Sequence, residues 1–151
     1  MHAEVTVHMA ASAEAIWDLI ADVTSVGRFS PETFEAEWLD GATGPTLGAR
    51  FRGHVRRNEK GPVYWTTCRV TACEPGREFG FDVIIGGRPG NHWHYRLTPR
   101  ENGTDVTESF RLSETIPLRI YWAMLGPLRR RRNKRDMRKT LERIKAVVET
   151  A

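Results

Sequence analysis

The sequence predicts an α+β protein in which a curved antiparallel sheet of about seven strands wraps around a long C-terminal helix, with two short helices after the first strand. Two observations lead to this fold class. Apolar and polar residues alternate in successive segments between residues 47 and 112, as in antiparallel strands with one buried face. Residues 137–148 instead place apolar side chains at helical spacing, which predicts a final amphipathic helix.

The composition agrees with one soluble domain over residues 1–151. The chain has 151 residues, of which 40% are hydrophobic and 28% charged, so it can bury a core without disulfides or a structural metal. No apolar run approaches the roughly 18 residues of a membrane span. The start, residues 1–4, lacks the basic and apolar regions of a signal peptide, which predicts a cytoplasmic protein.

The first part of the chain predicts a short strand followed by two helical segments. Residues 3–9 alternate, and Ser12 with acidic Glu14 behind it is typical of a helix N-terminus. Apolar residues then follow at helical spacing, which predicts one buried face: Ile16, Leu19, Ile20 and Val23. A second helical turn is expected to end near Phe29, before a strand in which Phe34, Ala36 and Trp38 alternate with glutamates.

The next four segments have period-two patterns that assign the buried face of each strand. For residues 47–56 the apolar set is Leu47, Ala49, Phe51 and Val55, and for 63–73 it is Tyr64, Thr66, Cys68, Val70 and Ala72. For residues 78–85 it is Phe79, Phe81, Val83 and Ile85, and for 92–98 it is Trp93, Tyr95 and Leu97. Glycine-containing turns separate these segments, so a meander of hairpins is the simplest topology.

The last predicted strand carries one carboxylate on its apolar face. Glu108 alternates in phase with Val106, Phe110 and Leu112. The final helix is expected to extend back to about Pro127, a residue suited to a first turn, with Met137, Leu141, Ile144 and Val148 as its buried stripe.

Neither the cysteines nor the histidines form a recognisable metal or redox motif. Cys68 and Cys73 are five residues apart, and on one regular strand an odd separation points them to opposite faces. His92 and His94 share a face, but two ligands on a predicted wet face do not make a metal site. His54 is also predicted outside. We therefore expect no metal and no cofactor.

Local segments in this order resemble the helix-grip fold of the SRPBCC superfamily, which includes START, Bet v 1 and polyketide cyclase proteins. The segments look like the polyketide cyclase/dehydrase-like branch: residues 38–41, 48–53, 74–79, 93–99, 103–109 and 140–145. The resemblance covers nearly the whole chain. It implies a ligand cavity between the sheet and the C-terminal helix, and that cavity agrees with the faces assigned above.

We expect the cavity to be lined by the inward side chains Phe51, Tyr64, Cys68, Phe81, Val83, Trp93, Tyr95, Glu108, Phe110, Met137 and Leu141. Glu108 has two interpretations: a cavity acid that hydrogen-bonds a ligand or transfers protons, or a structural carboxylate paired with a neighbouring arginine or the backbone. Tyr64 and Tyr95 are its candidate polar companions, or simply aromatic core residues.

The chain carries its excess positive charge at the C-terminal end. Residues 126–151 hold ten Lys and Arg against three Asp and Glu. The densest run includes Arg129, Arg130, Arg131 and Arg132. It follows the apolar segment 116–128, which is either a cap on the cavity mouth or an entrance lid that touches a membrane surface. The arginines are either a solvated helix end or a site for an anionic membrane, and the absence of interleaved aromatics argues against nucleic acid.

Two functions follow from these observations. The first is binding of a small hydrophobic molecule, such as a lipid, a polyketide or an aromatic compound, in a carrier or sequestering role. The second is an enzyme of the polyketide cyclase/aromatase type in which Glu108 acts as the catalytic acid or base. Either a monomer or a homodimer is compatible with the sequence.

Overall fold

A computed structural model describes residues 2–56, 63–113 and 134–150. The strands are β1 (His2–Met9), β2 (Thr33–Trp38), β3 (Arg50–Arg56), β4 (Val63–Glu74), β5 (Glu78–Ile85), β6 (Arg88–Arg100) and β7 (Gly103–Leu112). Between β1 and β2 lie helix α1 (Ala13–Ala21) and the 3-10 helix η1 (Val23–Arg28). Residues 134–149 form the C-terminal helix. The predicted α+β helix-grip architecture is confirmed.

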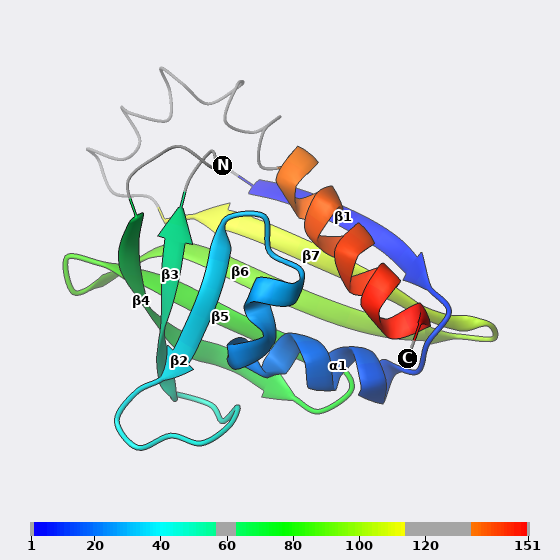
Figure 1. Cartoon of the computed structure of the whole chain (residues 1–151), viewed down its shortest axis with the longest axis horizontal. Coiled ribbons are helices and arrows are strands. Elements are labelled where there is room, and N and C mark those ends of the chain that lie inside the picture. The colour runs from blue at the N-terminus through cyan, green and yellow to red at the C-terminus, as the bar shows by residue number, and fades with distance from the viewer. Residues whose placement is uncertain (1, 57–62, 114–133, 151) are drawn as a thin grey trace.

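The strands form one antiparallel sheet in the order β1-β7-β6-β5-β4-β3-β2. Strands β2 to β7 make the predicted meander, whereas β1 returns to the far edge and pairs with β7 from His2 opposite Arg111 to Met9 opposite Thr104. The C-terminal helix, orange to red in Figure 1, runs across one face of this curved sheet, and α1 lies across its lower part. The core fills the space between the helices and that face.

The helices are anchored by capping and by one buried stripe each. The Ser12 hydroxyl accepts a hydrogen bond from the backbone N–H of Ala15, and the side chain of Asp22 accepts one from the N–H of Thr24 at the start of η1. On the C-terminal helix, Met137 and Leu141 are at most 1% exposed. Complete burial of such a side chain contributes about 1.5–3 kcal/mol, which holds the helix on the sheet.

Two longer-range hydrogen bonds fasten the helices to the sheet. The indole N–H of Trp17 on α1 donates to the backbone oxygen of Glu78 at the start of β5 (2.8 Å). The N–H of Ala10, just after β1, donates to Glu149 near the end of the C-terminal helix (3.0 Å). The first and last parts of the chain are therefore tied together.

Bulges and strand ends account for the residues whose predicted burial was wrong. One extra residue interrupts the ladder in each of β2, β4 and β6. Phe34, predicted to be inward, is the extra residue of β2 and is 44% exposed. Ile85, also predicted to be inward, is the last residue of β5 and is 48% exposed. Leu47 precedes β3 and is 71% exposed, because the strand begins only at Arg50.

The bulge in β4 also corrects the prediction for the cysteines. Cys68 pairs with Val83, and beyond the shift Cys73 pairs with Phe79, whose ring is buried in the core. Opposite residues of paired strands share a face, so both thiols lie on the inner side of the sheet. Both cysteines are free.

Candidate functional site

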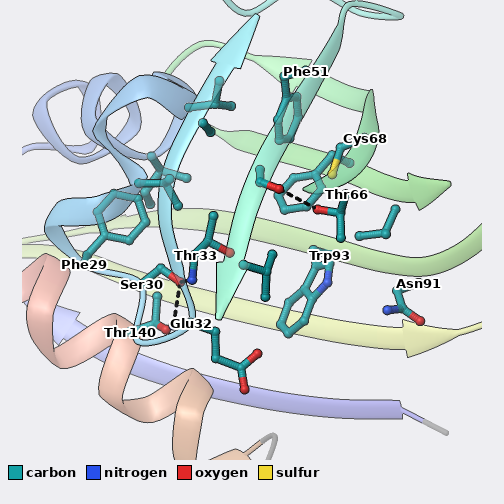
Figure 2. Close-up of a pocket in the computed structure, with 18 of the residues that line it drawn as sticks. Phe29, Ser30, Glu32, Thr33, Phe51, Thr66, Cys68, Asn91, Trp93 and Thr140 are labelled. Atoms are coloured by element: carbon teal, nitrogen blue, oxygen red, sulfur yellow. Dashed lines mark hydrogen bonds between the residues drawn. The ribbon is translucent and has the colours of Figure 1, made fainter. Parts of the chain in front are cut away.

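A cavity of about 190 Å³ lies between the inner face of the sheet, η1 and the C-terminal helix. A space of this size corresponds to roughly six water molecules at liquid density, or to a small organic molecule. Figure 2 shows side chains from both sides converging on it, with Phe51, Cys68 and Trp93 from the sheet and Thr140 from the helix. Most of the cavity wall is apolar. It is formed by the aromatic and aliphatic side chains of Ile20, Val23, Val26, Phe29, Phe51, Val55, Phe79, Phe81, Val83, Trp93 and Met137.

The structure brings together nine of the eleven side chains that the sequence assigned to a ligand site. These are Phe51, Tyr64, Cys68, Phe81, Val83, Trp93, Tyr95, Glu108 and Met137. The other two lie in the core beside the cavity. Phe110 packs against Trp93 with a ring separation of 4.8 Å, and Leu141 is fully buried. The four arginines at 129–132 and the apolar segment 116–128 lie outside the described residues.

Polar residues of the cavity wall were missed by the sequence interpretation. Asn91 lies on β6 two residues before Trp93 and therefore on the same face, but the strand was predicted to begin only at residue 92. Ser30 and Thr33 lie where η1 leads into β2, and the Ser30 hydroxyl accepts from the Thr33 N–H (3.0 Å). Periodicity could have identified Asn91, whereas the other two depend on how the loop folds back.

One glycine in the cavity wall leaves room for two neighbouring threonine side chains. Gly53 on β3 lines the cavity. A Cβ atom there would lie 3.1 Å from the methyl group of Thr33 and 3.5 Å from the hydroxyl of Thr66. The Thr66 hydroxyl donates to the Gly53 carbonyl (3.4 Å), so β3 and β4 are joined at this point by a side chain as well as by the sheet.

Glu108 and Tyr95 form the polar centre of the site. They lie opposite each other on β7 and β6, and both line the cavity. Their exposed fractions are 2% and 8%. The Tyr95 hydroxyl hydrogen-bonds the Glu108 carboxyl, whereas Oε2 of Glu108 has no hydrogen-bond partner among the described residues. A buried polar atom without a partner costs about 1–3 kcal/mol, and such an atom in a cavity wall is available to a ligand.

Burial sets the protonation state of this pair. Burial raises the pKa of Glu108 from 4.5 to about 8, and the hydrogen bond from Tyr95 acts in the opposite direction. The pKa of Tyr95 is raised well above 10, mainly by burial and further by the neighbouring carboxyl. Near pH 7 both groups are therefore mostly neutral.

The Cys68 thiol is a poor nucleophile. Burial raises its pKa to about 12, and its exposed fraction is 3%. Since the thiolate is the reactive form, a thiol with this pKa does not attack a substrate near neutral pH. Cys68 therefore acts as a small apolar part of the cavity wall.

The histidines of the sheet pair with carboxylates on neighbouring strands, outside the cavity. His92 contacts Asp82 through Nδ1 and the Ser113 hydroxyl through Nε2 (3.0 Å). His94 contacts Glu78 (3.0 Å), and His54 contacts Glu35 (2.8 Å). Within residues 2–56, 63–113 and 134–150, no cluster of three or more His, Cys, Asp or Glu side chains could hold a metal ion. The contacts indicate structural roles for these histidines.

The outer face of β2, β3 and β4 carries a stack of aromatic and cationic side chains. Trp65 stacks on His54 with a centroid separation of 4.0 Å, and the Arg52 guanidinium lies 4.1 Å from the Trp65 ring. On the other side of His54 lies Phe34, at 4.4 Å. The exposed Phe34 ring is thus held on the outer face by its contact with the His54 ring.

Fold and site together define a helix-grip protein with a largely apolar cavity and a buried acid. The family model described as polyketide cyclase/dehydrase and lipid transport matches residues 1–149. The chain therefore belongs to this family, within the SRPBCC superfamily. No curated protein matches it.

Solved structures give the same fold. A polyketide-cyclase-like protein from Corynebacterium glutamicum is 28% identical, with a TM-score of 0.56 over 99% of this chain and 85% of its own. The di-domain ARO/CYC StfQ from the steffimycin biosynthetic pathway is 14% identical, with a TM-score of 0.77 over 99% of this chain and 50% of its own. A protein from Mesorhizobium loti is 13% identical, with a TM-score of 0.69 over 100% of this chain and 98% of its own. None of the described helices is long and apolar enough to span a membrane.

Proposed function

We propose that this protein binds a small, mostly apolar organic molecule in the cavity and carries or sequesters it. The observation that supports this function most is a cavity of about 190 Å³ with a predominantly aromatic and aliphatic wall. Specific small-molecule sites have this character: apolar walls supply the affinity, and a few polar groups orient the ligand. Membership of a family that includes lipid transport agrees with a carrier role.

The test is to fill the cavity without changing the rest of the sheet. Thr66 and Thr71 both lie on β4, but Thr66 lines the cavity and Thr71 is exposed. Thr66→Trp should abolish binding of a neutral fluorescent probe such as 1-aminoanthracene, because the indole occupies the space. Thr71→Trp introduces the same side chain on the same strand and should bind the probe like the wild type.

Native mass spectrometry of the gently purified protein provides a second measurement. A retained small molecule in the wild type, absent from Thr66→Trp, would identify the ligand directly. If the wild type bound neither the probe nor any retained molecule, or if Thr66→Trp bound the probe as well as the wild type, the proposed function would be wrong.

One observation also favours a second candidate, an enzyme of the polyketide cyclase/aromatase type. Glu108, with its raised pKa, and Tyr95 are adjacent in the cavity wall, and a mostly protonated carboxyl near neutral pH can act as a general acid. In this reaction class the cavity shape would position a poly-β-keto chain, and Glu108 would move a proton. Unchanged turnover of such a chain by Glu108→Gln would exclude the role of this carboxyl.

A further inference from the structure

The unpartnered oxygen of Glu108 places a specific requirement on the ligand. Tyr95 hydrogen-bonds this carboxyl, and because Oε2 has no partner, the bond is made to the other oxygen. Oε2 thus remains as an unused hydrogen-bonding atom in the wall of a mostly apolar cavity. A ligand that satisfies it recovers a hydrogen bond that folding left unmade.

The surroundings of Glu108 favour its neutral form. Its cross-strand neighbours are Val5 on β1 and Tyr95 on β6. Met137 on the C-terminal helix lines the same cavity. The ionisable lining residues, besides Tyr64, Tyr95 and Cys68, are the carboxyl groups of Glu32, Glu108 and Asp136, and no described lining residue is Lys, Arg or His. A buried carboxyl without a nearby cation holds its proton, and that proton makes Oε2 a donor.

Because of these features, the affinity of a ligand should depend on the charge of its polar group. A carbonyl oxygen accepts the hydrogen bond from a protonated carboxyl and brings no charge into the cavity. A carboxylate adds a negative charge to a site whose described ionisable groups are acidic, and it loses its hydration on entry. An ammonium group requires Glu108 to ionise beside an apolar wall.

We infer that the bound molecule carries a neutral carbonyl group, as in a ketone, aldehyde or ester, that accepts a hydrogen bond from Glu108, and that molecules ending in a carboxylate are rejected. This inference rests on the proposed binding function and specifies the ligand of the same site.

The test uses four ligands with the same eight-carbon chain: octane, 2-octanone, octanoate and octylamine. Each displaces 1-aminoanthracene from the wild type, Glu108→Leu and Glu108→Gln. In the wild type at pH 7, 2-octanone should bind about tenfold more tightly than octane, as expected for one hydrogen bond of about 1.4 kcal/mol. Octanoate should bind more weakly than octane. Glu108→Leu should remove the preference for the ketone and still bind octane.

The pH dependence distinguishes the carboxyl from a general polar effect. If only protonated Glu108 binds the ketone, its apparent affinity should fall roughly tenfold between pH 7 and pH 9, because the protonated fraction falls from about 0.9 to about 0.1 with a pKa of about 8. Glu108→Gln keeps a neutral donor that does not titrate. Its affinity for 2-octanone should be the same at both pH values.

The outcomes separate this inference from the function on which it rests. If octane binds but 2-octanone binds no more tightly, or if octanoate or octylamine is preferred, the carbonyl assignment is overturned and the binding function stands. An equal pH dependence in the wild type and Glu108→Gln also overturns it. If neither octane nor 2-octanone binds and Thr66→Trp shows no loss of probe, both ideas fail.

Discussion

Replacing Glu108 by Gln should remove a pH-dependent loss of stability from the folded protein. The folded-state pKa of this carboxyl is raised from 4.5 to about 8, so between these values the folded chain holds a proton that the unfolded chain has released. The free energy of unfolding is then highest below pH 4.5 and decreases as the pH rises toward 8. At 1.36 kcal/mol per unit, the full window of about 3.5 units corresponds to about 5 kcal/mol. That is a large part of the roughly 5–15 kcal/mol that stabilises an ordinary domain.

Urea denaturation of the wild type and Glu108→Gln at pH 5, 7 and 9 measures this effect. The difference in unfolding free energy between the two proteins should change by about 4 kcal/mol in favour of Gln from pH 5 to pH 9. Taking the difference between the two proteins removes the titration of every other group that both share. The slope of the unfolding free energy against urea concentration should be the same for both proteins, so that the comparison refers to the same unfolding reaction.

Glu149→Gln is the matched control. Hydrogen bonds from Lys145 and from the Ala10 N–H hold the pKa of Glu149 below its usual 4.5. The stability that Glu149 contributes is therefore present above its unfolded pKa and is lost only in acid, so its difference from wild type should be nearly constant from pH 5 to pH 9. A constant difference for Glu108→Gln as well would refute the reasoning, since it would mean that Glu108 is ionised in the folded protein throughout this range.

Three further predictions concern other parts of the chain. His92→Ala should lower the unfolding free energy by about 1–3 kcal/mol in urea titrations, because it leaves a buried carboxylate without its partner, whereas His94→Ala, at a more exposed pair, should cost at most about 1 kcal/mol. Iodoacetamide should label Cys73 but not Cys68 in the folded protein, because Cys68 is buried with a pKa of about 12. Peptide mass spectrometry measures the labelling, and equal labelling of both cysteines would contradict this prediction. Replacing the four arginines at 129–132 by Gln should weaken co-sedimentation with anionic vesicles at low salt, and equal sedimentation of both proteins would show that the cluster does not contribute to vesicle binding.

Periodicity predicted the order of the elements and most of the buried faces. The stripe that contains Met137 and Leu141 is buried as expected, and so are the alternating residues of β1. The errors occur at bulges and at strand ends: Phe34 is the extra residue of the bulge in β2, and Ile85 is the exposed last residue of β5. A bulge inserts one residue into a ladder with little change in composition, so alternation alone cannot locate it.

The centre of the site was more predictable than its periphery. Glu108 is conspicuous in the sequence because a carboxylate in phase with apolar neighbours must be buried, and it is 2% exposed. Its partner Tyr95 follows once the register of β6 and β7 is known. Phe29 and Ser30 line the cavity only because η1 folds back onto the sheet, which is a tertiary contact without a local sequence signal.

The pairing of β1 with β7 also has a consequence for how the protein is made. The first strand is synthesised first, but its partner is completed only at Leu112, with His2 opposite Arg111. At about 5–20 residues per second, a ribosome needs roughly 5 to 20 s to produce the intervening chain. During that time β1 has an unpaired edge and four apolar side chains, Ala3, Val5, Val7 and Met9, that the finished sheet buries. The nascent chain therefore presents a strand that can pair with other chains, and translation slowed before residue 112 should increase its aggregation and its dependence on chaperones.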